Sequence, residues 1–314
     1  MKELRIVFMG TRDFAVDTLN ALIEAKYNLV GIITAPDRLA GRGRKMNESA
    51  VKKFALEKEL KILQPTNLKD KEFISELESL KANLQIVVAF RMLPKIVWQM
   101  PKYGTINLHA SLLPDYRGAA PINWAIINGE TKTGVSTFFI DEKIDTGEVI
   151  LQEETIIDEN ETVGELHNKL MKIGSELVVK TVKLIKKGNV KTFKQTSEEH
   201  KIAPKIFTET CKINWAKPMN ETFNLIRGLN PYPAAWTMLH NDSNEIKVKI
   251  YDVKKELEEH SYKIGKIIST KNSVKVAVNE GFIIVESLQL ANKKKMDIRS
   301  LLNGFEFNEN AFFE

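Results

Sequence analysis

The chain has 314 residues, of which 43% are hydrophobic and 28% charged, and its formal net charge is +5. This size and composition predict a soluble globular protein of two domains or one large α/β domain, and the mild positive charge allows an anionic partner without requiring one. A single cysteine, Cys211, rules out a disulfide framework within the chain, and no apolar stretch is long enough to span a bilayer. The first apolar run, Leu4–Met9, is too short for a signal peptide, so we expect a cytoplasmic protein.

The first half of the chain alternates short apolar runs with segments of helical spacing. Buried strands are expected at Leu4–Met9, Leu29–Thr34, Ile62–Leu63, Leu84–Phe90 and Thr105–His109. Helices are expected at Phe14–Ala25, Glu48–Leu60, Asp70–Lys81 and Ala120–Asn128. This alternation predicts an α/β fold with a doubly wound, mostly parallel sheet.

The pattern then changes. A strand pair is expected at Gly134–Ile140 and Glu148–Ile157, followed by a long helix, Val163–Lys187, that ends at Gly188. The polar, lysine-rich residues 190–206 are interpreted as a basic linker, although a solvated helix end followed by a surface loop has the same composition. We therefore expect a first domain at 1–189 and a second at 207–314.

The second domain is expected to begin with a helix near Met219–Arg227 and to continue in short β-type runs. These runs are Trp236–Leu239, Ile246–Val253, Gly265–Ser269, Val274–Val278 and Phe282–Leu290. Five short strands fit a small barrel of the oligonucleotide-binding (OB) type, but their number alone does not distinguish a barrel from a sandwich.

Asn107 and His109 are the first candidates for chemistry. They stand at i and i+2 of an expected strand, so both side chains leave the same face at the sheet edge where doubly wound proteins bind ligands. An amide donor beside an imidazole can stabilise a developing oxyanion, and the ring can shuttle a proton. An Asn-x-His pair taken alone is more often structural.

A loop rich in Ser, Pro and Gly, residues 110–118, follows His109 directly and is expected to line a cleft. Asp145, in the turn between the two later strands, is the third candidate because a carboxylate near His109 would orient the ring and stabilise imidazolium. The alternative is a turn residue chosen for its backbone preference. Its Asp-Thr-Gly triplet also resembles an aspartic protease motif, but no second triplet supplies the paired carboxylate.

The segment Pro36–Lys45 carries four cations and two glycines, which predicts a mobile, positively charged loop. The cations are Arg38, Arg42, Arg44 and Lys45. Such a loop on the ligand edge of the sheet could bind nucleic-acid phosphates, although a solvated surface loop is an equal alternative. Gly10–Phe14 lacks the spacing of a dinucleotide fingerprint, and the histidines besides His109 are too scattered for a zinc site, so we expect no metal.

These motifs together resemble the formyltetrahydrofolate-dependent formyltransferases, and among them the methionyl-tRNA formyltransferase family, over almost the whole chain. The most specific matches are Ile106-Asn-Leu-His-Ala-Ser-Leu-Leu-Pro114 and Arg117-Gly-Ala-Ala-Pro121, which the wider group shares. The matches to the tRNA-dependent family are Arg5–Thr11, Pro36–Gly43, Ile226–Pro231, Pro233–Trp236 and the tail from Gln289 to Gly304. The chain departs from the family at Arg12 and Asp17, where proline is usual, and at Ala89-Phe-Arg-Met92.

The resemblance implies transfer of a formyl group from 10-formyltetrahydrofolate to methionine on initiator methionyl-tRNA, with Asn107, His109 and Asp145 as catalytic residues. It implies a folate pocket lined by Val88, Ala89, Phe90, Leu93, Ser111, Leu112, Leu113 and Pro114. It further implies that the cationic segment and the barrel contact the tRNA; no obligate protein partner is expected. Two alternatives remain: the same chemistry on a small acceptor such as an amino-sugar nucleotide, and an RNA-binding module without catalysis.

Overall fold

The computed structural model describes residues 3–40, 45–196 and 200–314. The chain divides into two compact units, which interleave along the sequence. The first unit comprises residues 1–118, 133–155 and 167–202, and the second comprises 119–132, 156–166 and 203–314. Within the described ranges, no helix combines the length and apolar character needed to cross a membrane.

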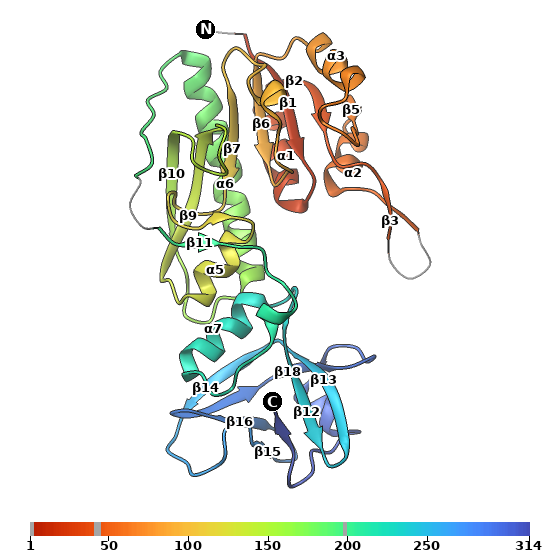
Figure 1. Ribbon diagram of the computed structural model, residues 1–314, viewed down its shortest axis with the longest axis vertical. Coiled ribbons are helices and arrows are strands. Elements are labelled where there is room, and N and C mark those ends of the chain that lie inside the picture. Colours follow the sequence, from red (N-terminus) through yellow and green to blue (C-terminus); the bar gives the residue numbers. More distant parts are fainter. Residues whose placement is uncertain (1–2, 41–44, 197–199) are drawn as a thin grey trace. The chain divides into compact units, whose positions relative to one another are not determined.

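The first unit is built on a seven-stranded sheet with the order β10-β9-β7-β6-β1-β2-β5 (Figure 1). The strands are β1 (Arg5–Gly10), β2 (Asn28–Ile33), β5 (Ile62–Leu63), β6 (Leu84–Val88), β7 (Thr105–His109), β9 (Lys132–Phe139) and β10 (Val149–Ile156). Every recorded pairing among β5, β2, β1, β6 and β7 is parallel, whereas β9 runs antiparallel to β7. The prediction of a mostly parallel sheet is confirmed.

Helices cover both faces of this sheet. They are α1 (Asp13–Glu24), α2 (Ala50–Glu57), α3 (Lys71–Ser79), α4 (Lys95–Trp98) and α6 (Val163–Lys187). Phe73 and Leu77 of α3 join a buried cluster with Met9 of β1 on one face. Leu108 of β7 points to the opposite face, where it packs so closely on α6 that a Cβ added at Gly174 would lie 2.8 Å from it. Cover on both faces is the doubly wound arrangement that the alternating sequence predicts.

The cationic segment differs from the expected loop. Two short strands, β3 (Arg38–Ala40) and β4 (Lys45–Asn47), form an antiparallel ladder there. Residues 41–44, and with them Arg42 and Arg44, lie outside the described residues. At the base of the ladder, Asp37 forms an ion pair with Lys52 and accepts a hydrogen bond of 2.8 Å from the Gln64 amide.

The second unit is a barrel of short antiparallel strands. One sheet has the order β19-β18-β13-β12-β20 and the other β14-β17-β16-β15. The strands are β12 (Ala235–Asn241), β13 (Asn244–Ile250), β14 (Val253–Leu257), β15 (Ile267–Ser269), β16 (Val274–Val278), β17 (Gly281–Val285), β18 (Ser287–Leu290), β19 (Met296–Asp297) and β20 (Phe312–Phe313). Five strands were expected here, but the runs Ile246–Val253 and Phe282–Leu290 are each broken in two.

The breaks turn two sheets into a barrel. Each of the two runs leaves one sheet and enters the other, at Tyr251–Asp252 and at Glu286. Between the opposite edges, Phe313 N–H donates to the Gly265 carbonyl at 2.8 Å and Ile267 N–H donates to Ala311 at 3.1 Å. Strands that cross between sheets, and edges that bond to each other, favour the expected barrel over a sandwich.

The second unit also contains the helices α5 (Pro121–Ile127), α7 (Met219–Leu229) and α8 (Ile298–Leu302). Two further short strands, β8 (Arg117–Gly118) and β11 (Ile202–Ala203), pair with each other in a separate two-stranded sheet. Gly228 of α7 lies so close to α5 that an added Cβ would be 2.7 Å from the Ile127 side chain. The apolar cluster in the barrel includes Trp215, Phe223, Ile226, Leu239, Val248, Val276, Ile283, Leu288 and Phe313.

Asp252 fixes one of the places where the chain changes sheets. Its carboxylate accepts hydrogen bonds from Ser287 and, at 2.8 Å, from Asn230, and it pairs with Lys295 at 2.8 Å. Partial burial alone would raise the pKa of Asp252, but the Lys295, Ser287 and Asn230 contacts outweigh burial and lower it.

This lowered pKa predicts an acid-sensitive barrel. A group whose pKa is lower in the folded state stabilises the fold above its unfolded pKa, about 3.9 for Asp, and that stabilisation is lost as pH falls through the folded value. As the pH is lowered below about 4, we expect the urea midpoint of the wild-type protein to decrease more steeply than that of Asp252→Asn. Parallel midpoint curves for the two proteins would contradict this role of Asp252.

Candidate active site

The candidate site lies at the carboxyl end of β7. Asn107 and His109 leave the same face of this strand, and Asn107 is in register with Val87 of the neighbouring strand β6. Asn107 is half-buried, and no protein hydrogen bond to its side-chain amide is present among the described residues. His109 is only 6% exposed, so its ring is held within the protein while the amide beside it can bind a ligand.

The loop after β7 turns back and fixes the His109 ring. The carbonyl of Tyr116 lies 2.8 Å from Nε2 of His109. Because a carbonyl oxygen can only accept a hydrogen bond, Nε2 carries a proton and donates a hydrogen bond to the Tyr116 carbonyl. The other ring nitrogen, Nδ1, is left for a different partner.

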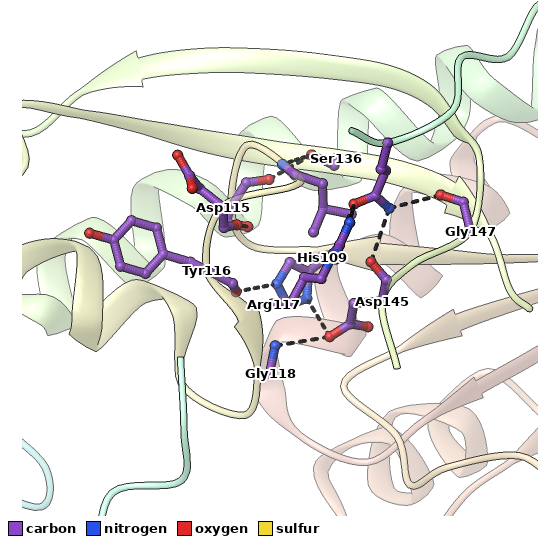
Figure 2. A network of polar contacts seen from close by, with 11 residues as sticks. His109, Asp115, Tyr116, Arg117, Gly118, Ser136, Asp145 and Gly147 are labelled. Atoms are coloured by element: carbon purple, nitrogen blue, oxygen red, sulfur yellow. Dashed lines mark hydrogen bonds and ion pairs between the residues drawn. The ribbon is translucent and has the colours of Figure 1, made fainter. Parts of the chain in front are cut away.

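Asp145 is that partner, and the structure brings it to His109 from the turn between β9 and β10 (Figure 2). Its Oδ2 lies 3.8 Å from Nδ1 of His109 and accepts a hydrogen bond of 3.0 Å from Gly118 N–H. The Asp145 side chain is 13% exposed, and its backbone is left-handed with φ of +55°. A carboxylate in this position faces the ring nitrogen that Tyr116 leaves free and can help to orient the ring.

Ser136 of β9 holds the middle of the loop. Its hydroxyl donates to the Ser111 carbonyl at 2.6 Å and accepts from Leu113 N–H at 3.1 Å. The amide of Gln152 donates to Leu113 and to Ser136, each at 2.9 Å. The residues expected to line the pocket from this side, Ser111, Leu112, Leu113 and Pro114, therefore lie on a loop fixed by buried hydrogen bonds.

The other expected pocket wall follows β6. The strand was expected to reach Phe90, but it ends at Val88, because Ala89 adopts a left-handed backbone with φ of +48°. Beyond this bend, Phe90–Met92 donate no backbone hydrogen bond to any described residue, while Leu93 returns to the core. Since β6 and β7 are neighbours, these N–H groups follow the same sheet edge as His109.

The expected nucleic-acid residues are only partly described. Arg38 is exposed in β3, and Lys45 lies in β4, but its side chain lies outside what the structure describes. Burial, and after it the charge of Arg38, lowers the pKa of Arg91. Arg91 itself donates to the carbonyls of Pro65 and, at 2.9 Å, Thr66. Arg38 and Arg91 are therefore near enough for their charges to interact.

Sequence reasoning missed Gln195 and gave Arg117 no role in the site. Gln195 stands in the segment interpreted as a basic linker, yet its side chain contacts both Arg117 and the turn that holds Asp145. No local signal marked it, because the surrounding residues are polar and without period. In the described ranges, no group of three or more His, Cys, Asp or Glu side chains is arranged to hold a metal ion.

Gly147 is required for the Asp145 turn. A Cβ added there would lie 1.6 Å from the carbonyl oxygen of Phe139, a backbone atom that cannot move aside cheaply. We expect Gly147→Ala to lower the free energy of unfolding by about 2 kcal/mol or more, since overpacking against backbone forces the strands apart. Gly304→Ala, where an added Cβ meets nothing within 4 Å, is the control for urea denaturation. Equal midpoints for the two variants would contradict this prediction.

Comparison with known proteins gives the family of this chain. A family described as "Formyl transferase" matches residues 4–182, and one described as "Formyl transferase, C-terminal domain" matches residues 205–306. The methionyl-tRNA formyltransferase of Flavobacterium johnsoniae is 57% identical to this chain, with 99% of each covered. That of Bacteroides fragilis is 52% identical, covering 98% of this chain and 97% of its own. The chain belongs to the methionyl-tRNA formyltransferase family. Members of this family are formyltransferases, and the fold described above is theirs.

Solved structures share this fold at lower identity. A sugar 3N-formyl transferase, WlaRD, aligns over 94% of this chain and all of its own with a TM-score of 0.66 and 24% identity. HypX from Aquifex aeolicus, in complex with tetrahydrofolic acid, aligns over 98% of this chain and 49% of its own with a TM-score of 0.66 and 17% identity. At these identities the likeness concerns the fold alone.

Proposed function

We propose that this chain transfers the formyl group of 10-formyltetrahydrofolate to the α-amino group of methionine on initiator methionyl-tRNA. The observation that carries the proposal is the meeting of His109, Asp145 and an unbonded Asn107 amide at the carboxyl end of β7. The full-length relatives named methionyl-tRNA formyltransferase, at 57% and 52% identity, support the choice of acceptor.

Each group has a role in the proposed reaction. The α-amine of methionine attacks the formyl carbon, and a bond from that carbon to the amine nitrogen forms while the formyl oxygen becomes an oxyanion. The Asn107 amide donates a hydrogen bond to this oxygen, and the charge of His109 imidazolium stabilises it. The His109 ring is oriented for this role because Nε2 bonds to the Tyr116 carbonyl and Asp145 faces the other nitrogen.

Collapse of the intermediate breaks the bond between the formyl carbon and N10 of the folate. The attacking amine loses one proton and N10 gains one, so the reaction needs a relay and no other reactant. Asp145 lies beside His109 and is 13% exposed, which suits it to accept and return that proton. Residues 88–93 and 111–114 flank the same edge and would hold the pterin, with the free N–H groups of Phe90–Met92 donating to it.

The acceptor end of the tRNA would contact the cationic segment that contains Arg38, Arg42, Arg44 and Lys45. The barrel within 207–314 and the lysine-rich residues 190–206 would hold phosphates further along the tRNA, and residues 1–189 would supply the catalytic site. Binding that depends on such contacts weakens steeply as salt rises.

The test is an acceptor competition. Purified protein and 10-formyltetrahydrofolate are mixed with initiator methionyl-tRNA, uncharged initiator tRNA and an amino-sugar nucleotide, and formyl transfer to each is followed by mass spectrometry. We expect formylmethionyl-tRNA as the product, with no formylation of uncharged tRNA. Preferential formylation of the amino-sugar nucleotide would show that methionyl-tRNA is not the acceptor. An absence of transfer to any amine would overturn the proposed function.

A further inference from the structure

The segment that follows α6 lies against the turn that carries Asp145. Phe193 exchanges two backbone hydrogen bonds with Val149, the first residue of β10, at 2.9 and 3.0 Å. The Thr192 hydroxyl donates to Glu148 one residue earlier. These contacts fix the direction of the chain, so that the side chain of Gln195 reaches the backbone of the turn 145–147.

The Gln195 amide makes four hydrogen bonds there. Its oxygen accepts from Nε and Nη2 of Arg117 at 3.0 and 2.7 Å. Its nitrogen donates to the backbone carbonyls of Asp145 and Gly147 at 2.9 and 2.8 Å. An amide has two acceptor sites and two N–H groups, so every hydrogen-bonding site of Gln195 is used.

Two consecutive residues, Arg117 and Gly118, hold Asp145 at two different points. Gly118 N–H binds the carboxylate directly, and the preceding residue, Arg117, holds the backbone of the turn through Gln195. Asp145 needs such support because its φ of +55° lies in a region that residues other than glycine seldom adopt. Strained backbone persists where the surrounding structure determines it from several sides.

We propose that Gln195 is a positioning residue for formyl transfer, which sets the place of the Asp145 carboxylate against His109. It acts through the turn 145–147 and touches no reacting atom, and Arg117 is its anchor. The inference rests on the proposed function in one respect, since it takes Asp145 as the group that relays the proton.

The chemistry of the contact gives a sharp variant. Glutamate in place of Gln195 keeps the length and the two contacts to Arg117, but it points a carboxylate oxygen at two carbonyl oxygens, so it disrupts only the turn side. Gln195→Asn keeps the amide and the net charge but is one methylene short. Gln99→Glu, on an exposed residue just after α4, makes the same change of charge and is the control.

The first readout is steady-state formylation of methionyl-tRNA. Misplacing a reacting group by about 1 Å costs on the order of 10²-fold, so we expect kcat to fall roughly 10- to 100-fold in Gln195→Glu and Gln195→Asn, with the KM for each substrate changed by less than about threefold. The Gln99→Glu control keeps wild-type kcat. A kcat within about twofold of wild type in both Gln195 variants would overturn the proposal.

The second readout asks whether Gln195 acts through Asp145. Residues that act as one unit are strongly non-additive, so Gln195→Glu is expected to lower the residual rate of Asp145→Asn no further. An equal fold-loss in the wild-type and Asp145→Asn backgrounds would show that Gln195 acts elsewhere and would contradict the proposal.

The third readout does not depend on the acceptor. The Gly118 amide, bonded to Asp145, is expected to exchange hydrogen slowly in the wild-type protein and at least about tenfold faster in Gln195→Glu. If the wild type formylates no methionyl-tRNA, the proposed function fails while faster exchange in the variant keeps the positioning role. Unchanged Gly118 exchange would overturn that role whatever the acceptor proves to be.

Discussion

Replacing His109 by alanine, or Asp145 by alanine, is expected to lower kcat for formylmethionyl-tRNA formation by roughly 10³-fold, within the range found for general acid–base and electrostatic groups. The His109 variant removes the ring beside the oxyanion. The Asp145 variant leaves Nδ1 of His109 without its carboxylate 3.8 Å away and removes the proton relay. Steady-state kinetics with purified initiator methionyl-tRNA measure both.

The fold and tRNA affinity should be unaffected in both variants. His109 packs at the end of a strand and Asp145 in a turn, and neither belongs to the apolar clusters that form the cores of the two units. His167→Ala removes the same kind of ring from α6, where it contacts Phe14 at 5.3 Å between ring centroids, and is the control. Near-normal turnover in either the His109 or the Asp145 variant would refute the catalytic assignment.

Asn107 is expected to contribute the next largest effect. Its amide has no protein partner in the described part of the chain, which fits a donor kept for the oxyanion of the substrate. Asn107→Ala should lower kcat about 10²- to 10³-fold, and Asn107→Asp should lower it at least as far because a carboxylate repels the developing charge. Parallel assays of kcat and of folate binding distinguish this loss of turnover from a loss of affinity for the folate.

The matched control for this prediction is Asn20→Ala. Asn20 lies on α1, and its amide bonds only to Glu24 on the exposed helix surface, 2.8 Å away, among the described residues. It should keep wild-type turnover. If Asn107→Ala weakened folate binding in proportion to turnover, the amide would serve binding in the ground state and the oxyanion role would be wrong.

Local pattern in the sequence sufficed for the elements that position the site. The expected strand Thr105–His109 agrees with β7, and the helix Val163–Lys187 agrees with α6. Both are decided by apolar spacing and by residues that end an element, such as Gly188 with its φ of +75°. Asn107 and His109 could be placed on one face for the same reason.

Features that depend on distant contacts could not be predicted. The apolar pattern runs through Asp252 and Glu286, so nothing local shows that the chain changes sheets there; the hydrogen bonds that cause it come from 35 residues away. The end of β6 at Val88 likewise depends on the left-handed backbone of Ala89. Gln195 was missed because its role depends on hydrogen bonds to residues that are 50 and 78 positions away in the sequence.

The most direct test of the account is a single-turnover experiment with enzyme in excess over methionyl-tRNA and saturating 10-formyltetrahydrofolate. It observes formyl transfer separately from substrate capture and product release. Asp145→Asn, which keeps the size of the side chain but carries no charge, should capture the tRNA normally and form product at least about 10²-fold more slowly than wild type. A single-turnover rate equal to that of wild type would contradict the central claim, that the Asp145 carboxylate beside His109 drives the chemical step.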